Sequence, residues 1–278
     1  MSPAGAPVGG LLVLVDPVAR RLDGESVRIA RDVLSAGAAA KVSLPDSPEE
    51  FARALARRGH RRPVIVGDDR ALVRAVGLLH RERGLGGDAA GVVSVVPVGQ
   101  MGTLGLVRAL GVPLSAVSAA RAALDGVVGM RDLLVDDSDG VVLGGLRIPP
   151  VRPPVPRPAG PSVRSAYRSL VRTLVGPPPA AARPARGGAG GHRLRVEADG
   201  VVLADVDRPL EDLSLEPGGG GLAEVVVRVD GTAVGARARA VTVTGSDFRY
   251  RADGAVAGPV RRRTWTLRPA AWGLIRPR

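Results

Sequence analysis

The chain has 278 residues, a formal net charge of +12, no cysteine, and aromatic side chains at only 2% of its positions. This length suffices for one large domain or two ordinary ones, and the lack of cysteine excludes disulfides, thiol catalysis and cysteine-based metal sites. The N-terminal apolar run is too short, and too poor in basic residues, for a signal peptide or a membrane span. We therefore expect a cytoplasmic protein, with or without peripheral contact at the inner face of the membrane.

The positive charge is compatible with three anionic partners: nucleic acid, an anionic membrane surface and a phosphorylated ligand. Lys41 is the only lysine, and the abundance of arginine, alanine, glycine and proline is typical of a GC-rich genome, which weakens any functional interpretation of the charge. Few aromatic rings are present to stack on bases, so an arginine-rich nucleic-acid binder is the least favoured alternative. Absence of oligonucleotide binding at low salt would exclude it.

Apolar runs alternate with amphipathic stretches in the first part of the chain. Short runs rich in β-branched residues predict buried strands at residues 11–15, 41–44, 63–66 and 92–96. Apolar residues at helical spacing predict helices within residues 25–40, where Gly37 closes the helix, and at 51–58, 71–81 and 104–110. Ser47, followed by Pro48 and two acids, marks the start of the second helix. Alternating strands and helices predict a parallel sheet covered on both faces.

Ligands of parallel sheets bind at the carboxyl ends of the strands, so the loops after the first, third and fourth strands are expected to meet. The last of these loops contains Gly99, Gly102 and Gly105 at the step from strand to helix. Free backbone N–H groups at such a step favour an anion such as phosphate. In a chain with 38 glycines, a plain tight turn is the more frequent explanation, and no Gly-Lys-Ser/Thr motif follows.

The sequence changes in character beyond Arg131. Short strands with glycine-containing turns are predicted at residues 133–135, 141–143, 146–148, 194–197, 201–206, 224–230, 237–244 and 264–267. Between them we expect a proline-dense tract at 149–161, a helix at 162–175 and a low-complexity loop at 176–191. The predicted domains are therefore an α/β domain at residues 1–132 and a β-rich domain at residues 133–278.

This order of elements resembles the bacterial diacylglycerol kinase family, which includes the sphingoid and related lipid kinases. The family's first strand ends in Asn-Pro, and here it ends in Asp16-Pro17. The Gly-Gly-Asp-Gly-Thr signature falls on VGDDR at residues 66–70. The next glycine motif falls on PVGQ at 97–100 and VRALGVP at 107–113, and the closing Asp-Gly-Glu on DGA at 253–255.

The resemblance implies a three-layer α/β domain with a parallel sheet, as in diacylglycerol kinases and NAD kinases, followed by an antiparallel β-sandwich domain. It also implies ATP and Mg²⁺ binding, a lipid cleft between the domains, and transfer of the γ-phosphoryl group to the hydroxyl of diacylglycerol or a similar lipid. Asp68 is the catalytic residue it implies, and an N-cap of the following helix is the alternative role of Asp68. The expected nucleotide-binding residues are Asp16, Gly67, Asp69, Gly99, Gly102, Thr103 and Gly105.

Several positions depart from the family's motifs. Asp69 replaces a glycine where the backbone approaches phosphate, and Arg70 replaces the threonine. The Asn-Asp pair after the second glycine loop is absent, Ala255 replaces the closing glutamate, and four glycines at 218–221 replace expected acids. These losses favour a decayed active site that retains at most nucleotide, anion or lipid binding and needs no cofactor. An active ATP-dependent lipid kinase that uses Mg²⁺ is the alternative.

No metal-ligating residue is expected from the sequence. The three histidines, His60, His80 and His192, are scattered among arginines on predicted surface segments and do not have the spacing of a metal site. The sequence specifies no oligomeric state.

Overall fold

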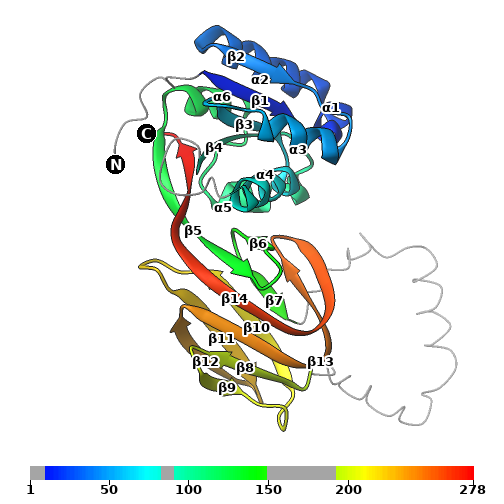
Figure 1. Ribbon diagram of the computed structural model, residues 1–278, viewed down its shortest axis with the longest axis vertical. Helices are drawn as coiled ribbons and strands as arrows, with labels where there is room; N and C mark the ends of the chain where they lie inside the picture. Colours follow the sequence, from blue (N-terminus) through cyan, green and yellow to red (C-terminus); the bar gives the residue numbers. More distant parts are fainter. Residues whose placement is uncertain (1–9, 83–90, 149–191) are drawn as a thin grey trace, which may run out of the picture.

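The computed structural model describes residues 10–82, 91–148 and 192–278 (Figure 1). The expected proline-dense tract at 149–161, helix at 162–175 and loop at 176–191 lie outside the described residues. The fold predicted from the sequence is confirmed in outline, because parallel strands and helices make up the first part and antiparallel strands the second.

The first part contains a parallel sheet with the strand order β4-β3-β1-β2. Its strands are β1 (Leu11–Val15), β2 (Ala40–Ser43), β3 (Arg62–Gly67) and β4 (Val92–Pro97). Every residue of β1, β3 and β4 is buried, as expected for parallel strands covered on both faces. Among the described strands, β2 pairs with β1 alone and forms an edge of the sheet.

Helices cover this sheet on both sides, so the first part has three layers. The helical elements are α1 (Pro17–Leu22), α2 (Gly24–Gly37), α3 (Pro48–Ala56), α4 (Asp69–Arg81), the 3₁₀ turn η2 (Met101–Thr103), α5 (Gly105–Ala109) and α6 (Ala116–Asp125). Helices α2 and α6 pack together on one face, and α3 and α4 on the other (Figure 1). Helix α3 begins after Ser47 as predicted, because the Ser47 hydroxyl accepts a hydrogen bond from the Glu50 N–H at 3.1 Å.

Two helices of the first part were not predicted. Helix α6 is built mainly from alanine, so its apolar face contrasts weakly with its polar face. Helix α1 follows β1 directly, with Asp16 as its N-cap and Pro17 in its first turn. The Asp-Pro pair therefore ends the strand and also starts a helix.

The second part consists of antiparallel strands around a separate hydrophobic core. They are β5 (Val127–Asp136), β6 (Val141–Val142), β7 (Leu146–Ile148), β8 (Leu194–Ala198), β9 (Val201–Ala204), β10 (Leu210–Pro217), β11 (Ala223–Val229), β12 (Thr232–Ala238), β13 (Ala240–Ala252) and β14 (Ala255–Arg276).

Three strand predictions in the second part need correction. Strand β10 was missed, because a register shift between Leu210 and Asp212 interrupts its alternation of buried and polar residues.

The single strand predicted at 237–244 is divided between β12 and β13 near Arg239. The carboxylate of Asp199 accepts the N–H groups of Arg239 and Ala240 at 2.9 and 2.8 Å, which turns the chain there. The strand predicted at 264–267 is a short piece of β14.

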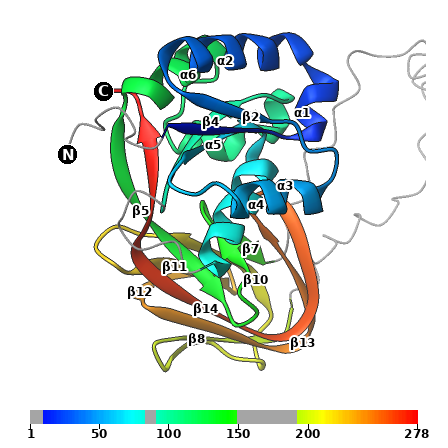
Figure 2. The same ribbon diagram turned by 45° about the horizontal axis from the view of Figure 1, so that its top comes forward.

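Strand β14 connects the two parts into one continuous sheet. It pairs antiparallel with β13 and β5, and near its end Gly273 and Leu274 pair in parallel with Val92 and Val93 of β4. Figures 1 and 2 both show β5 and β14 running side by side from the lower strands to the upper domain. Leu274 is buried in the first core, and Trp265 of the same strand in the second.

The predicted domain boundary at residue 132 falls inside β5. Leu133 belongs to the first core and its neighbour Leu134 to the second, because successive side chains of a strand point to opposite faces. The division at 132 stays a prediction. In the described ranges, no helix is long and apolar enough to cross a membrane.

Replacing Leu274 should destabilise the protein strongly, because its side chain is fully buried where β14 meets β4. We expect Leu274→Ala to lower the free energy of unfolding by about 2–5 kcal/mol, measured by urea denaturation. Val256→Ala is the control, since Val256 lies on the same strand but is 52% exposed. An effect of Leu274→Ala no larger than that of the control would contradict this description of β14.

Candidate functional site

The loops after β1, β3 and β4 meet at the carboxyl edge of the parallel sheet, as predicted. A Cβ atom added to Gly67 would lie 3.0 Å from the Cβ of Asp16 and 2.8 Å from the Cβ of Ala71. A Cβ added to Gly99 would lie 3.2 Å from the Cβ of Asp68. Both glycines therefore allow neighbouring loops to approach closely, and the expected site residues from three separate segments come together here.

Asp16 is buried, and the protein itself uses both of its carboxylate oxygens. Oδ1 accepts the N–H of Val18 at 2.8 Å, which caps α1. Oδ2 accepts a hydrogen bond from Arg74 of α4 at 3.0 Å, and the Arg74 guanidinium lies over the ring of Phe51 on α3. Asp16 thus ties α1 to α4. Nucleotide binding by Asp16 stays a prediction.

Asp68 lies at the N-terminus of α4, with one carboxylate oxygen engaged and one available. Its Oδ1 accepts the N–H groups of Arg70 and Ala71, each at 3.1 Å. Asp68 is therefore an N-cap, which the sequence offered as an alternative to catalysis. Its Oδ2 has no hydrogen-bond partner among the described residues, and the side chain is half-buried. A catalytic role of Asp68 stays a prediction.

Asp69 is turned into the protein and binds the start of α5. Its Oδ2 accepts the N–H of Leu106 at 2.8 Å, and its Oδ1 accepts the N–H of Val107 at 2.9 Å. Burial raises the pKa of Asp69, although these two hydrogen bonds act in the opposite direction. An anion is favourable where N–H groups of a helix start are unpaired. Here the carboxylate of Asp69 accepts the N–H groups of Leu106 and Val107 that follow Gly105.

The remainder of the glycine loop is more open. Thr103 donates its N–H and its hydroxyl to the carbonyl of Gln100 at 2.8 and 3.0 Å, closing the short 3₁₀ turn. Within the described part of the chain, the N–H groups of Gly99, Gln100 and Met101 have no hydrogen-bond partner. A Cβ added to Gly102 would meet nothing within 4 Å. The segment from Gly99 to Gly102 is the part of the loop that retains free donors beside Asp68.

A fourth acid reaches this region from the second part of the chain. Asp253, in the Asp-Gly turn between β13 and β14, accepts the N–H groups of Leu143, Gly144 and Gly145 at 2.7, 2.8 and 3.2 Å. Burial raises its pKa, and the charge of nearby Asp69 raises it further, while the three hydrogen bonds oppose the shift. The sequence contributed Asp253 only to the resemblance and gave it no place in the site. Its Asp-Gly pair between two strands was the available signal.

A cavity of about 450 Å³ lies beside Leu106, between α5 and the second part of the chain. Its apolar lining includes Leu106, Leu110 and Leu143. The charged side chains at its border are Arg131 and Asp132 of β5, and the glycines at 218–220 also line it. A volume in this range is typical of small-molecule sites, which are about 300–1,000 Å³. Three of the four glycines that replace the expected acids, at 218–220, therefore line this cavity.

The described residues do not form a resident metal site. No group of three or more His, Cys, Asp or Glu side chains in these ranges is placed to hold a metal ion. Asp16, Asp69 and Asp253 instead accept hydrogen bonds from the protein.

Comparison with known proteins identifies the fold. No protein-family model matches the chain, and no curated protein matches it by sequence. Solved structures from Bacillus anthracis str. Sterne do match, two of them assigned provisionally as diacylglycerol kinases and one described as a diacylglycerol kinase. Their TM-scores are 0.72, 0.68 and 0.62, at 14%, 13% and 12% sequence identity.

These matches extend over nearly the whole of each chain. The first covers 98% of this chain and 97% of the other, and the second and third cover 96% of each. At such low identity the likeness establishes the fold. The chain therefore has the two-part fold of these structures, as the resemblance in its sequence predicted.

Removing the Asp69 carboxylate should destabilise the protein. Asp69→Ala leaves the buried N–H groups of Leu106 and Val107 without a partner, and we expect the free energy of unfolding to fall by about 2 kcal/mol in urea denaturation. The matched control is Asp125→Ala, because Asp125 is an exposed acid of α6 and its replacement should change stability by about 0.5 kcal/mol or less. Equal effects of the two substitutions would refute the anchoring role of Asp69.

The raised pKa of Asp253 should make stability depend on pH. The folded protein holds the Asp253 proton to a higher pH than the unfolded chain does. The contribution of Asp253 to the free energy of unfolding therefore falls as the pH rises above about 4. Asp253→Asn removes this contribution. Urea denaturation at a series of pH values should show the stability difference, wild type minus variant, decreasing as the pH rises. A difference that is constant or increases with pH would contradict the raised pKa of Asp253.

Proposed function

We propose that this protein has a decayed kinase active site and retains binding of a phosphate-bearing ligand, a nucleotide or a lipid. The observation that carries the proposal is the engagement of Asp69 with the start of α5. The Asp69 carboxylate accepts hydrogen bonds from the backbone N–H groups that a phosphate would need at the start of α5. A second anion at the same place would also be repelled by that charge.

The acids of the site support the same conclusion. Phosphoryl transfer requires positioned donors and metal ions to neutralise the charge that develops on the transferred group. Mg²⁺ is commonly held by one or two carboxylates together with the phosphates of the substrate. Among the acids gathered here, Asp68 is the one with an oxygen that the described residues leave unengaged. This is a poorer set of ligands than efficient transfer would require.

Ligand binding is still supported by what the site retains. The N–H groups from Gly99 to Met101 lack partners among the described residues, and exposed Arg70 adds a positive charge beside Asp68. Together they favour a phosphate group of a nucleotide or of another anion. The neighbouring cavity has apolar leucines at its border, with Arg131 and Asp132 of opposite charge beside them, and its apolar part is suited to the acyl chains of a lipid.

An active ATP-dependent lipid kinase is the second candidate, and the available Oδ2 of Asp68 is the observation that favours it. In that case Asp68 would accept the proton of the lipid hydroxyl as the γ-phosphoryl group of ATP is transferred. ATP and Mg²⁺ would then be required. In either case we propose a cytoplasmic protein that contacts the anionic inner face of the membrane, with nucleic acid as the least favoured partner.

The test is calorimetry with Mg·ATP, with and without diacylglycerol in mixed micelles, followed by radiolabelled phosphate transfer in the same samples. We expect wild-type protein to bind Mg·ATP, diacylglycerol or both, and to transfer no more phosphate than Asp68→Ala. Asp125→Ala controls for loss of a negative charge elsewhere on the surface.

The possible results separate the candidates. Transfer that Asp68→Ala abolishes and Asp125→Ala preserves would establish the active kinase in place of the decayed one. Failure of both Mg·ATP and diacylglycerol to bind would overturn the proposal as well.

A further inference from the structure

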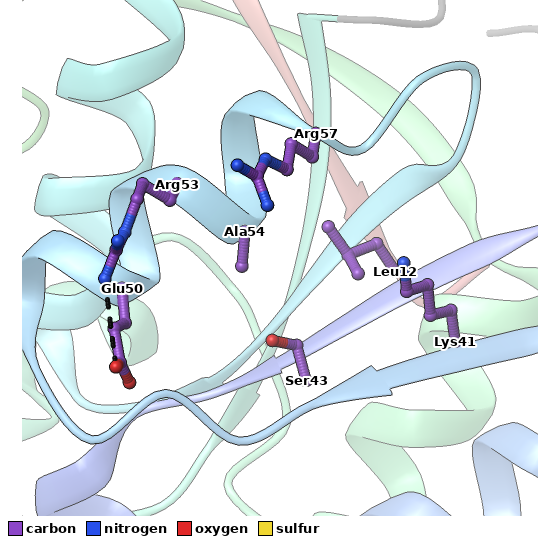
Figure 3. Close-up of a pocket in the computed structure, with 7 residues that line it drawn as sticks. All are labelled: Leu12, Lys41, Ser43, Glu50, Arg53, Ala54 and Arg57. Atoms are coloured by element: carbon purple, nitrogen blue, oxygen red, sulfur yellow. Dashed lines mark ion pairs between the residues drawn. The ribbon is translucent and has the colours of Figure 1, made fainter.

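A second hollow lies in the first part of the molecule, between α3 and the edge strand β2 (Figure 3). Its volume is about 260 Å³. We call it the β2–α3 pocket. Phe51 of α3 does not line it; that residue packs under Arg74, the partner of Asp16.

One face of helix α3 and one face of strand β2 form the walls of the pocket. Glu50, Arg53, Ala54 and Arg57 follow the i, i+3, i+4, i+7 spacing that puts side chains on one face of a helix. Lys41 and Ser43 are two residues apart on β2, so they share one face of the strand. Leu12, the buried neighbour of Lys41 on β1, supplies an apolar floor.

The lining carries more positive than negative charge. Its one acid, Glu50, pairs with Arg53 at 3.8 Å and also accepts the N–H of Asp46 at 2.8 Å. Over the described residues, Lys41 and Arg57 make no ion pair. Figure 3 shows Arg53 extended toward Glu50, whereas Lys41, Ser43 and Arg57 border the same open space. Two cations and a hydroxyl therefore face the pocket without a carboxylate of their own.

We propose that the β2–α3 pocket binds a small phosphate-bearing anion through Lys41, Ser43 and Arg57. A guanidinium can donate two parallel hydrogen bonds to a phosphate, and an ammonium contributes a compact charge. The Ser43 hydroxyl can donate a third bond. The volume is below the range of about 300–1,000 Å³ typical of drug-sized ligands, so the pocket fits a phosphate group with a short substituent. That group belongs either to a soluble phosphate ester or to a lipid headgroup.

A lysine on an edge strand also has a structural explanation, because charged side chains prevent edge-to-edge pairing of sheets. That explanation accounts for Lys41 alone. It does not explain why Arg57, at the end of α3, lines the same pocket as Lys41 and Ser43. The proposal does not depend on the proposed function, since none of these residues belongs to the candidate site.

The experiment compares two double variants that each remove two positive charges. Lys41→Ala/Arg57→Ala changes the pocket, and Arg31→Ala/Arg121→Ala changes exposed residues of α2 and α6 on the other face of the sheet. Inorganic phosphate and glycerol 3-phosphate are titrated by calorimetry. Sedimentation with phosphatidylcholine vesicles, with and without phosphatidic acid, tests the lipid headgroup.

We expect the pocket variant to weaken binding of at least one phosphate probe by about 10-fold or more, because charge-assisted hydrogen bonds are lost. The control should bind within about twofold of wild type. Loss with the soluble probes identifies a soluble ester as the ligand. Loss with phosphatidic acid vesicles alone identifies a headgroup. Equal weakening in both double variants, or no binding of any probe to wild type, would overturn the proposal.

Two further measurements keep the result specific. Thermal unfolding reports whether each variant is folded, and Arg57→Gln provides a milder change that removes the charge and keeps much of the side chain. Mg·ATP binding by the pocket variant should equal that of wild type, because the candidate site is unchanged. Loss of Mg·ATP binding in parallel with phosphate binding would overturn the assignment of a separate pocket.

Discussion

The pairing of β14 with β4 and β5 is the interaction on which the rest of this structure depends. Without it, β4 would be an unpaired edge of the parallel sheet, and the antiparallel strands would not be joined to that sheet by backbone hydrogen bonds. The same strand places Trp272 in the first core and Trp265 in the second. Because backbone hydrogen bonds run along β14 through both parts, their relative position is set by sheet geometry, which is stiffer than a flexible linker.

This arrangement also determines which acids lie near α5. Asp253 is in the turn that precedes β14, and the strand holds that turn against the backbone at residues 143–145. Asp69 approaches α5 from the first part. Burial raises the pKa of both carboxylates, and the charge of Asp69 raises that of Asp253 further. Such groups are costly unless backbone N–H groups stabilise them, and here each one accepts at least two. We interpret the acids at this junction as structural anchors, with Asp68 as the exception.

Local sequence patterns predicted the elements whose burial is regular. Strands β1, β3 and β4 are buried along their whole length, so their apolar runs were unambiguous, and parallel strands then required their loops to share one edge. Other features depend on distant partners. The partners of Asp69 lie 37 and 38 residues away, and those of Asp253 lie 108 to 110 residues away. No local pattern contains such contacts, so the sequence placed Asp69 with the ligand and left Asp253 out of the site.

The parallel pairing of β14 with β4 has a consequence for the order of folding. Val93 and its partner Leu274 are separated by roughly 180 residues, and a ribosome adding about 5–20 residues per second needs roughly 10–40 s to make that length. During this interval β4 has no neighbour on one side. An exposed edge of apolar residues is a template for pairing with other chains. The nascent chain therefore has a period of aggregation risk that ends only when β14 is in place.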